Sequence, residues 1–141
     1  MLDKTQPKTL YTARVRTDGS RDGGVSKSSD GRLDIKHSVP GTPGTGTNPE
    51  QLLAAGWSAC FQGAIGIAAQ RMKVKIPSGT SIDAEIDLVL TDGEYSLAAR
   101  LNVSVPGLPR DVVEKLVAAA HDTCPYSKAL KASTPIALNV V

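Results

Sequence analysis

An uncharged run of eighteen residues, from position 52 to position 69, constrains the fold of this chain more than any other feature. A helix of that length without charges is buried either in the core of a protein or in a membrane. The run is rich in alanine and glycine and contains Ser58 and Gln62, which make its transfer into lipid unfavourable. We therefore expect a buried core helix and no membrane insertion.

The same helix has clear start signals. Asn48 suits the N-cap, Pro49 suits the first helical position, and Gln51 lies three residues beyond the cap. No helix breaker follows before about Met72. The sequence therefore predicts one long helix over residues 49–72.

A second helix is predicted to begin near Pro109. Its apolar stripe, extended by one turn, reaches Cys124, and Pro125 ends or bends the helix there. Because this stripe is the core face, Cys124 is expected to face the first helix, which contains Cys60. The stripe consists of Val112, Val113, Leu116, Val117 and Ala120.

Strands are predicted for much of the remaining chain. Asp92-Gly93 predicts a two-residue type I′ turn, which fixes the register of an antiparallel hairpin. Further strands are expected at residues 9–17, 32–38 and 136–141, with loops at 18–24 and 40–47. The fold class is therefore α+β, with two long helices packed on antiparallel strands. The hairpin register pairs Leu90 with Tyr95, Leu88 with Leu97, Ile86 with Ala99, Ile82 with Val103, and Glu85 with Arg100.

Length and charge limit the classes of function. A chain of 141 residues suits a single domain over positions 1–141. Sixteen basic and fourteen acidic residues, with no run of like charge longer than two, do not form a nucleic-acid-binding stripe. Residues 1–7 lack the apolar core of a secretory signal, and two cysteines are too few for a disulfide scaffold. We therefore expect a protein of the reducing cytoplasm.

The two cysteines are the candidates for chemistry. Cys60 lies in the middle of the first helix, with Gly56 one turn before it and Gly63 one turn after, which leaves space at the thiol. A lone cysteine there would most simply be a small buried hydrophobe, whereas two thiols on packed helices can form a redox pair with Cys124. Apolar surroundings raise the pKa of a thiol, so a reactive Cys60 needs a cation. Arg21, on a glycine-rich loop, is the candidate.

Other polar residues have simpler explanations. Glu50 in the first turn of the long helix is favoured by the helix dipole alone. His121 and Cys124 could form half of a zinc site with Cys60, although the usual close ligand pairs are missing and His121 is expected to be exposed. His37 is expected to be a satisfied strand histidine. No metal or cofactor is expected.

Two segments resemble one protein family. Residues 48–61 (NPEQLLAAGWSACF) and 118–127 (AAAHDTCPYS), with residues 10–13 (LYTA) and 21–23 (RDG), resemble the organic hydroperoxide resistance (Ohr) proteins of the OsmC/Ohr superfamily. The likeness covers nearly the whole chain from residue 10 onwards. In this chain the loop before Arg21 is one residue longer than the family pattern, and Trp57 stands where a tyrosine or phenylalanine is usual.

The resemblance implies an OsmC/Ohr-like fold in an intertwined homodimer. It implies a thiol peroxidase in which Cys60 is the peroxidatic thiolate, Cys124 the resolving thiol, Arg21 the activating arginine and Glu50 the carboxylate that holds this arginine. The substrates it implies are alkyl and lipid hydroperoxides, and the reductant is a dihydrolipoyl-type dithiol. A Cys/His metal-binding protein and a non-catalytic small-ligand-binding stress protein are the alternatives.

The positions of Glu50 and Cys60 add a geometric constraint. Ten residues on one helix separate the two by about 15 Å. Either the side chain of Arg21 spans much of this gap, or Glu50 and Arg21 approach Cys60 from a second subunit.

Overall fold

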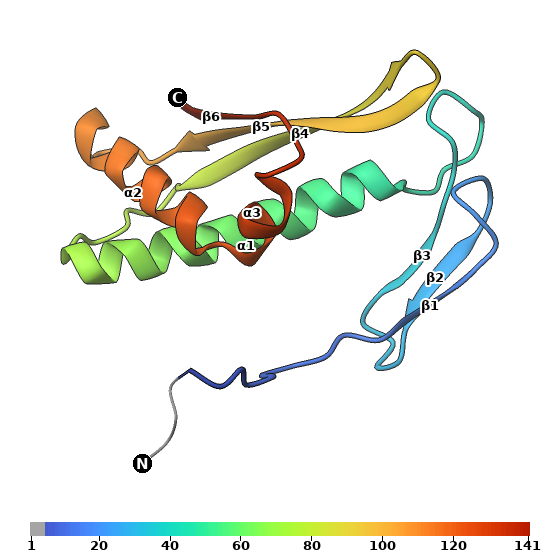
Figure 1. Cartoon of the computed structure of the whole chain (residues 1–141), viewed down its shortest axis with the longest axis horizontal. Helices are drawn as coiled ribbons and strands as arrows, with labels where there is room; N and C mark the ends of the chain where they lie inside the picture. Colours follow the sequence, from blue (N-terminus) through green and yellow to red (C-terminus); the bar gives the residue numbers. More distant parts are fainter. Residues whose placement is uncertain (1–4) are drawn as a thin grey trace. The chain divides into compact units, whose positions relative to one another are not determined.

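The computed structural model describes residues 5–141 and confirms the α+β class (Figure 1). The absence of a secretory signal was expected from residues 1–7, of which 1–4 lie outside the described residues. Contacts divide the chain into two compact units, one ending at Pro49 and the other spanning Glu50–Val141. The first unit contains a small sheet, and the second contains a sheet with helices.

The sheet of the first unit has three short antiparallel strands in the order β1-β2-β3, namely β1 (Val15–Asp18), β2 (Val25–Ser28) and β3 (Asp34–Lys36). The predicted strand over residues 9–17 is correct only for its end. Leu10 and Tyr11 are 86% and 78% exposed, and residues 9–14 pair with no described strand, so their alternating pattern does not reflect burial. The prediction also missed β2, which is short and polar.

The sheet of the second unit confirms the predicted hairpin. Strands β4 (Ser81–Thr91) and β5 (Glu94–Ser104) pair antiparallel with every residue pair that the turn predicted. Asp92 and Gly93 have φ angles of 50° and 81°, the left-handed values that a type I′ turn requires. β6 (Ile136–Val140) pairs parallel to β5, which corrects the all-antiparallel expectation. The two helices between β5 and β6 provide the crossover that a parallel pair needs.

The helices follow the predicted start and stop signals. α1 (Pro49–Met72) has the expected bounds, and α2 (Arg110–Thr123) ends just before Cys124. A third helix, α3 (Pro125–Leu130), was not predicted. The sequence predicts that Pro125 ends or bends the second helix, but a proline also suits the first turn of a new helix. Cys124 between the two helices is extended, with φ −63° and ψ 122°, as is typical of a residue before proline.

The core of the second unit lies between the helices and one face of the β4-β5-β6 sheet (Figure 1). α1 is long and apolar enough to cross a membrane by length and composition alone. In this chain its side chains pack against those of the sheet and of α2, as expected for a core helix. The central buried residues are Trp57, Phe61, Ile65, Leu101, Val103, Val113 and Val117.

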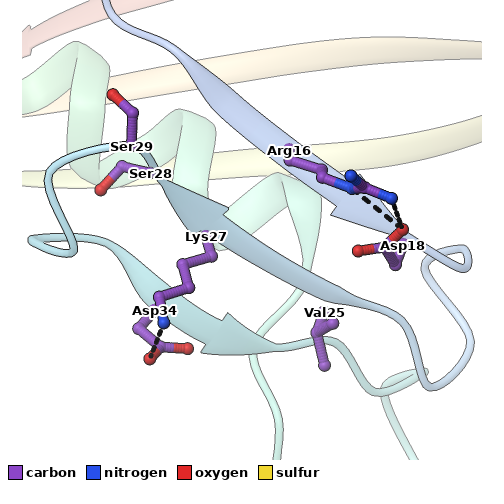
Figure 2. Close-up of a pocket in the computed structure, with 7 residues that line it drawn as sticks. All are labelled: Arg16, Asp18, Val25, Lys27, Ser28, Ser29 and Asp34. Atoms are coloured by element: carbon purple, nitrogen blue, oxygen red, sulfur yellow. Dashed lines mark hydrogen bonds and ion pairs between the residues drawn. The ribbon is translucent and has the colours of Figure 1, made fainter.

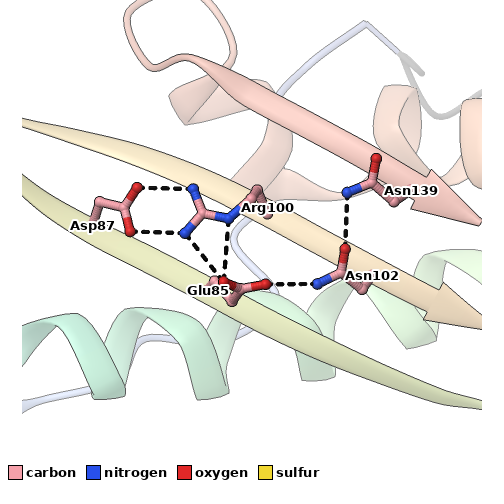
Figure 3. Close-up of polar contacts among 5 residues, drawn as sticks. All are labelled: Glu85, Asp87, Arg100, Asn102 and Asn139. Atoms are coloured by element: carbon pink, nitrogen blue, oxygen red, sulfur yellow. Dashed lines mark hydrogen bonds and ion pairs between the residues drawn. The ribbon is translucent and has the colours of Figure 1, made fainter. Parts of the chain in front are cut away.

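The opposite face of this sheet is polar. Arg100 makes two hydrogen bonds of 2.8 Å to Asp87 and also contacts Glu85 at 3.2 Å, which confirms the predicted cross-strand charge pair (Figure 3). Asn102 donates to Glu85 at 2.9 Å, and Asn139 of β6 donates to Asn102 at 2.8 Å. The Arg100 guanidinium lowers the pKa of Asp87. These bonds join all three strands, so they support both the antiparallel and the parallel register.

Candidate active site

The two cysteines meet where α1 passes the junction of α2 and α3. The Sγ atom of Cys124 lies 3.4 Å from the Sγ atom of Cys60, and both are free thiols. Cys124 is fully buried, whereas Cys60 is half-buried. The expectation that the apolar stripe of the second helix turns Cys124 toward Cys60 is confirmed.

The segment Cys124–Ser127, here called the 124–127 segment, holds Cys124 in this place. The backbone N–H of Cys124 donates to the carbonyl of Ala120 at 2.8 Å and so ends α2. The N–H of Lys128 donates to the carbonyl of Cys124 at 3.0 Å and so begins α3. Cys124 is therefore fixed from both sides along the chain.

The 124–127 segment also contacts α1 beside Cys60. A Cβ atom at Gly56 would lie 2.8 Å from the Tyr126 hydroxyl, so the space predicted at Gly56 is filled by this tyrosine. Gly63 has open space, as predicted. The indole N–H of Trp57 donates to the Ser127 hydroxyl at 3.1 Å, and both residues are fully buried.

The contacts of Trp57, Tyr126 and Ser127 were not predicted from the sequence. Two signals were available, because Tyr126 and Ser127 lie two and three residues after Cys124, and Trp57 lies one turn before Cys60. The pairing itself depends on the register of two helices, which the sequence does not contain.

The surroundings of Cys60 favour its protonated form. Burial raises the pKa of the Cys60 thiol. The sulfur–sulfur hydrogen bond with Cys124 raises it further, and the charge of the second sulfur adds a smaller effect in the same direction. The backbone N–H of Tyr126 hydrogen-bonds the Cys60 sulfur and lowers this pKa in part. A reactive thiolate at Cys60 therefore needs a cation near the sulfur.

The other two predicted site residues lie at the expected places in the chain. Arg21 begins the turn between β1 and β2, in the unit that ends at Pro49. Glu50 lies in the first turn of α1, in the same unit as both cysteines. Each position is defined within its own unit, so the joint action of Arg21, Glu50 and Cys60 stays a prediction.

The two histidines differ from their predicted surroundings. His121 is half-buried rather than exposed, with its ring 6.5 Å from the ring of Phe61, and burial lowers the pKa of its imidazole. His37 is buried and its Nε2 atom hydrogen-bonds Ser26 at 2.7 Å, but Nδ1 has no partner among the described residues. Within residues 5–141 no three His, Cys, Asp or Glu side chains form a group that could hold a metal ion.

A pocket of about 430 Å³ lies on the sheet of the first unit, and none of the predicted site residues lines it (Figure 2). Its charged side chains are paired, with Arg16 3.2 Å from Asp18 and Lys27 4.0 Å from Asp34. Arg16 is largely exposed. The pocket therefore offers exposed ion pairs and serine hydroxyls, and neither cysteine lines it. Its lining residues are Arg16, Asp18, Val25, Lys27, Ser28, Ser29 and Asp34.

The fold and the facing thiols define a class of α+β proteins with a cysteine pair between two core helices. Residues 41–139 match the family described as OsmC-like protein. The chain is similar to the organic hydroperoxide resistance protein of Xanthomonas axonopodis pv. citri (strain 306), with 40% identity over 137 residues, which are 94% of this chain and 96% of that relative.

Two further similarities come from Bacillus subtilis. The chain is 38% identical to the organic hydroperoxide resistance protein OhrB of strain 168, over 93% of this chain and 98% of OhrB. The crystal structure of OhrB matches with a TM-score of 0.88 at 37% identity, covering 94% of this chain and all of that one. The chain belongs to the OsmC-like protein family and, within it, to the organic hydroperoxide resistance branch.

Proposed function

We propose that this protein is a cysteine-based peroxidase that reduces alkyl and lipid hydroperoxides to alcohols. The observation that carries the proposal is the 3.4 Å separation between the sulfurs of two free cysteines, one half-buried and one fully buried. The half-buried Cys60 is accessible to a substrate, and Cys124 behind it is placed to resolve an oxidised Cys60. Relatives named for organic hydroperoxide resistance support the choice of substrate.

The proposed reaction has three steps. The Cys60 thiolate attacks the distal oxygen of the hydroperoxide, an S–O bond forms as the O–O bond breaks, and the alkoxide leaves and takes up a proton as the alcohol. The Cys60 sulfenic acid then condenses with the Cys124 thiol, releasing water and forming the Cys60–Cys124 disulfide. A dihydrolipoyl-type dithiol reduces this disulfide by thiol–disulfide exchange and is itself oxidised to a cyclic disulfide.

Arg21 and Glu50 are proposed to activate the thiolate. The raised pKa of Cys60 calls for a cation, and a guanidinium keeps its charge when it is buried. Arg21 is proposed to stabilise the thiolate and orient the peroxide, while Glu50 holds the arginine. This assignment rests on the position of each residue in the family pattern.

The surroundings of Cys60 support an apolar substrate. The thiol lies within the uncharged run 52–69 of α1. Burial of an alkyl chain contributes about 0.8 kcal/mol for each CH₂ group. We therefore expect organic hydroperoxides to be preferred over hydrogen peroxide. We further propose an intertwined homodimer located in the reducing cytoplasm, where a dithiol can regenerate both thiols.

The test is consumption of cumene hydroperoxide with dihydrolipoamide as the reductant. Wild-type protein should turn over, Cys60→Ser should be inactive, and Cys124→Ser should form the Cys60 sulfenic acid without forming the disulfide. Ser58→Ala is a matched control, since its hydroxyl bonds the α1 backbone at 2.7 Å and has no proposed role. A Cys60→Ser protein with the full rate would end the proposal.

A further inference from the structure

We propose that Trp57 and Ser127 are positioning residues for disulfide formation. In this proposal their hydrogen bond holds the 124–127 segment against α1 and sets the rate at which Cys124 attacks the oxidised Cys60. The inference rests on the peroxidase function proposed above. It adds a role for two residues that take no part in the reaction with hydroperoxide.

The bond lies next to the sulfur contact and joins the same two parts of the chain. Trp57 is one turn before Cys60 on α1, and Ser127 is three residues after Cys124. The Nε1–Oγ distance is 3.1 Å, and both side chains are fully buried. A buried hydrogen bond that loses one partner leaves the other partner unsatisfied, so separation of the two segments at this point is unfavourable.

The sulfur contact needs such support. A thiol is a weak hydrogen-bond donor, so the contact between Cys124 and Cys60 does little to hold the two segments together. The sulfurs must also approach from 3.4 Å to about 2.05 Å for the disulfide to form. Intramolecular attack is fast only when the reacting atoms are held close and aligned. The Trp57–Ser127 bond supplies this constraint from outside the reacting pair.

The Cys60 sulfenic acid has two competing fates. It can condense with the Cys124 thiol and release water, or a second hydroperoxide can oxidise it to sulfinic acid and leave as the alcohol. Faster condensation therefore protects Cys60 from irreversible oxidation. On this proposal, the Trp57–Ser127 bond determines how much excess hydroperoxide the protein tolerates.

The experiment uses the full chain with Ser127→Ala, Ser127→Thr and Trp57→Phe. Rapid mixing with cumene hydroperoxide, followed by acid quench and mass analysis, separates sulfenic acid, disulfide and sulfinic acid. Ser127→Ala and Trp57→Phe should form the disulfide at least about fivefold more slowly, which is the change expected for one net hydrogen bond. Both should accumulate sulfinic acid at lower peroxide, while the first step keeps its wild-type rate. Ser127→Thr, which keeps a hydroxyl, should restore disulfide formation.

Two controls separate positioning from general loss of stability. Val103→Ala shortens a fully buried side chain on β5 and should destabilise the protein without slowing disulfide formation. The double variant Trp57→Phe/Ser127→Ala should be no slower than the slower single variant, because both remove the same bond. If Trp57→Phe does not fold, Ser127→Ala decides alone, since it deletes a single oxygen atom.

The outcomes distinguish the two proposals. Wild-type rates of disulfide formation in Ser127→Ala, with normal reaction toward hydroperoxide, would overturn the positioning role and leave the peroxidase intact. Equal slowing in Val103→Ala would also overturn it. If wild-type Cys60 forms no sulfenic acid with hydroperoxide, the peroxidase proposal fails and the positioning role fails with it.

Discussion

At the scale of single residues, the proposed chemistry depends on the charge of the Cys60 sulfur. The environment that brings Cys124 to Cys60 also raises the pKa of Cys60, because burial, the hydrogen bond with Cys124 and the charge of the second sulfur all disfavour a negative charge there. The amide of Tyr126 offsets only part of this effect. In the proposed mechanism, the proximity of Cys124 therefore makes Cys60 less reactive, and an external cation has to compensate.

Substitution of Arg21 tests this compensation. Arg21→Ala should move the pH midpoint for alkylation of Cys60 upward from its wild-type position. The reason is that burial and Cys124 then act without the opposing guanidinium. The measurement is the rate of iodoacetamide alkylation at Cys60 against pH, followed by mass analysis of the reduced protein.

Two variants serve as comparisons for this midpoint. Arg21→Lys keeps the positive charge and should retain part of the downward shift, although it loses the planar fork of donors. Arg16→Ala removes an exposed arginine that is paired with Asp18 and should leave the midpoint unchanged. Identical midpoints in wild type and Arg21→Ala would assign the activation to another group.

At the scale of elements, the features that could be predicted are those determined by residues close together in the chain, such as a turn or a helix start. The hairpin register follows from Asp92-Gly93 because its positive φ angles admit only one kind of turn, and Glu85 with Arg100 agrees with it. The bounds of α1 follow from its cap and proline. By contrast, no strand within residues 5–141 pairs with the alternating residues 9–14. The parallel pairing of β6 depends on how two helices cross over. These features are set by distant parts of the chain.

The candidate site shows the same difference between features set by nearby residues and features set by distant parts of the chain. Both cysteines and Arg21 could be chosen as candidates from the residues, whereas Glu50 was a candidate only through the family resemblance. The facing of Cys60 and Cys124 followed from the apolar stripe of α2. The bond between Trp57 and Ser127 could not be predicted, because it depends on the register of α1 against α3. The helix α3 was not predicted, because a proline can either end one helix or begin another.

The hairpin turn provides a stability test at this scale. Gly93→Ala should lower the free energy of unfolding by about 1–2 kcal/mol, because a side chain is strained at the φ of 81° found here. Chemical denaturation followed by far-UV circular dichroism measures the change. Gly93→Asn, which tolerates the left-handed region better, should lose less. Equal stability of Gly93→Ala and wild type would mean that the turn is not fixed in this conformation.

At the scale of the whole molecule, exposed apolar residues support the proposed dimer. Leu88, Leu90 and Tyr95, near the turn of the β4-β5 hairpin, are 46%, 61% and 73% exposed. They lie on the same face of the sheet as the apolar residues that pack against the helices, but farther from the core. Monomeric proteins rarely leave a contiguous apolar patch of this kind uncovered, and a second copy of the chain would cover it.

A charge on this apolar face should therefore weaken the dimer. Wild-type protein should sediment as two chains of 14.7 kDa each at micromolar concentration, whereas Leu90→Glu should shift toward the monomer. The reason is that an unpaired carboxylate is costly to bury at an interface. Ser96→Glu is the matched control, because Ser96 is exposed and pairs with Val89 on the opposite face of the same hairpin. It should sediment as wild type does. A monomeric wild type, or a Leu90→Glu variant as dimeric as wild type, would show that this face is not the interface.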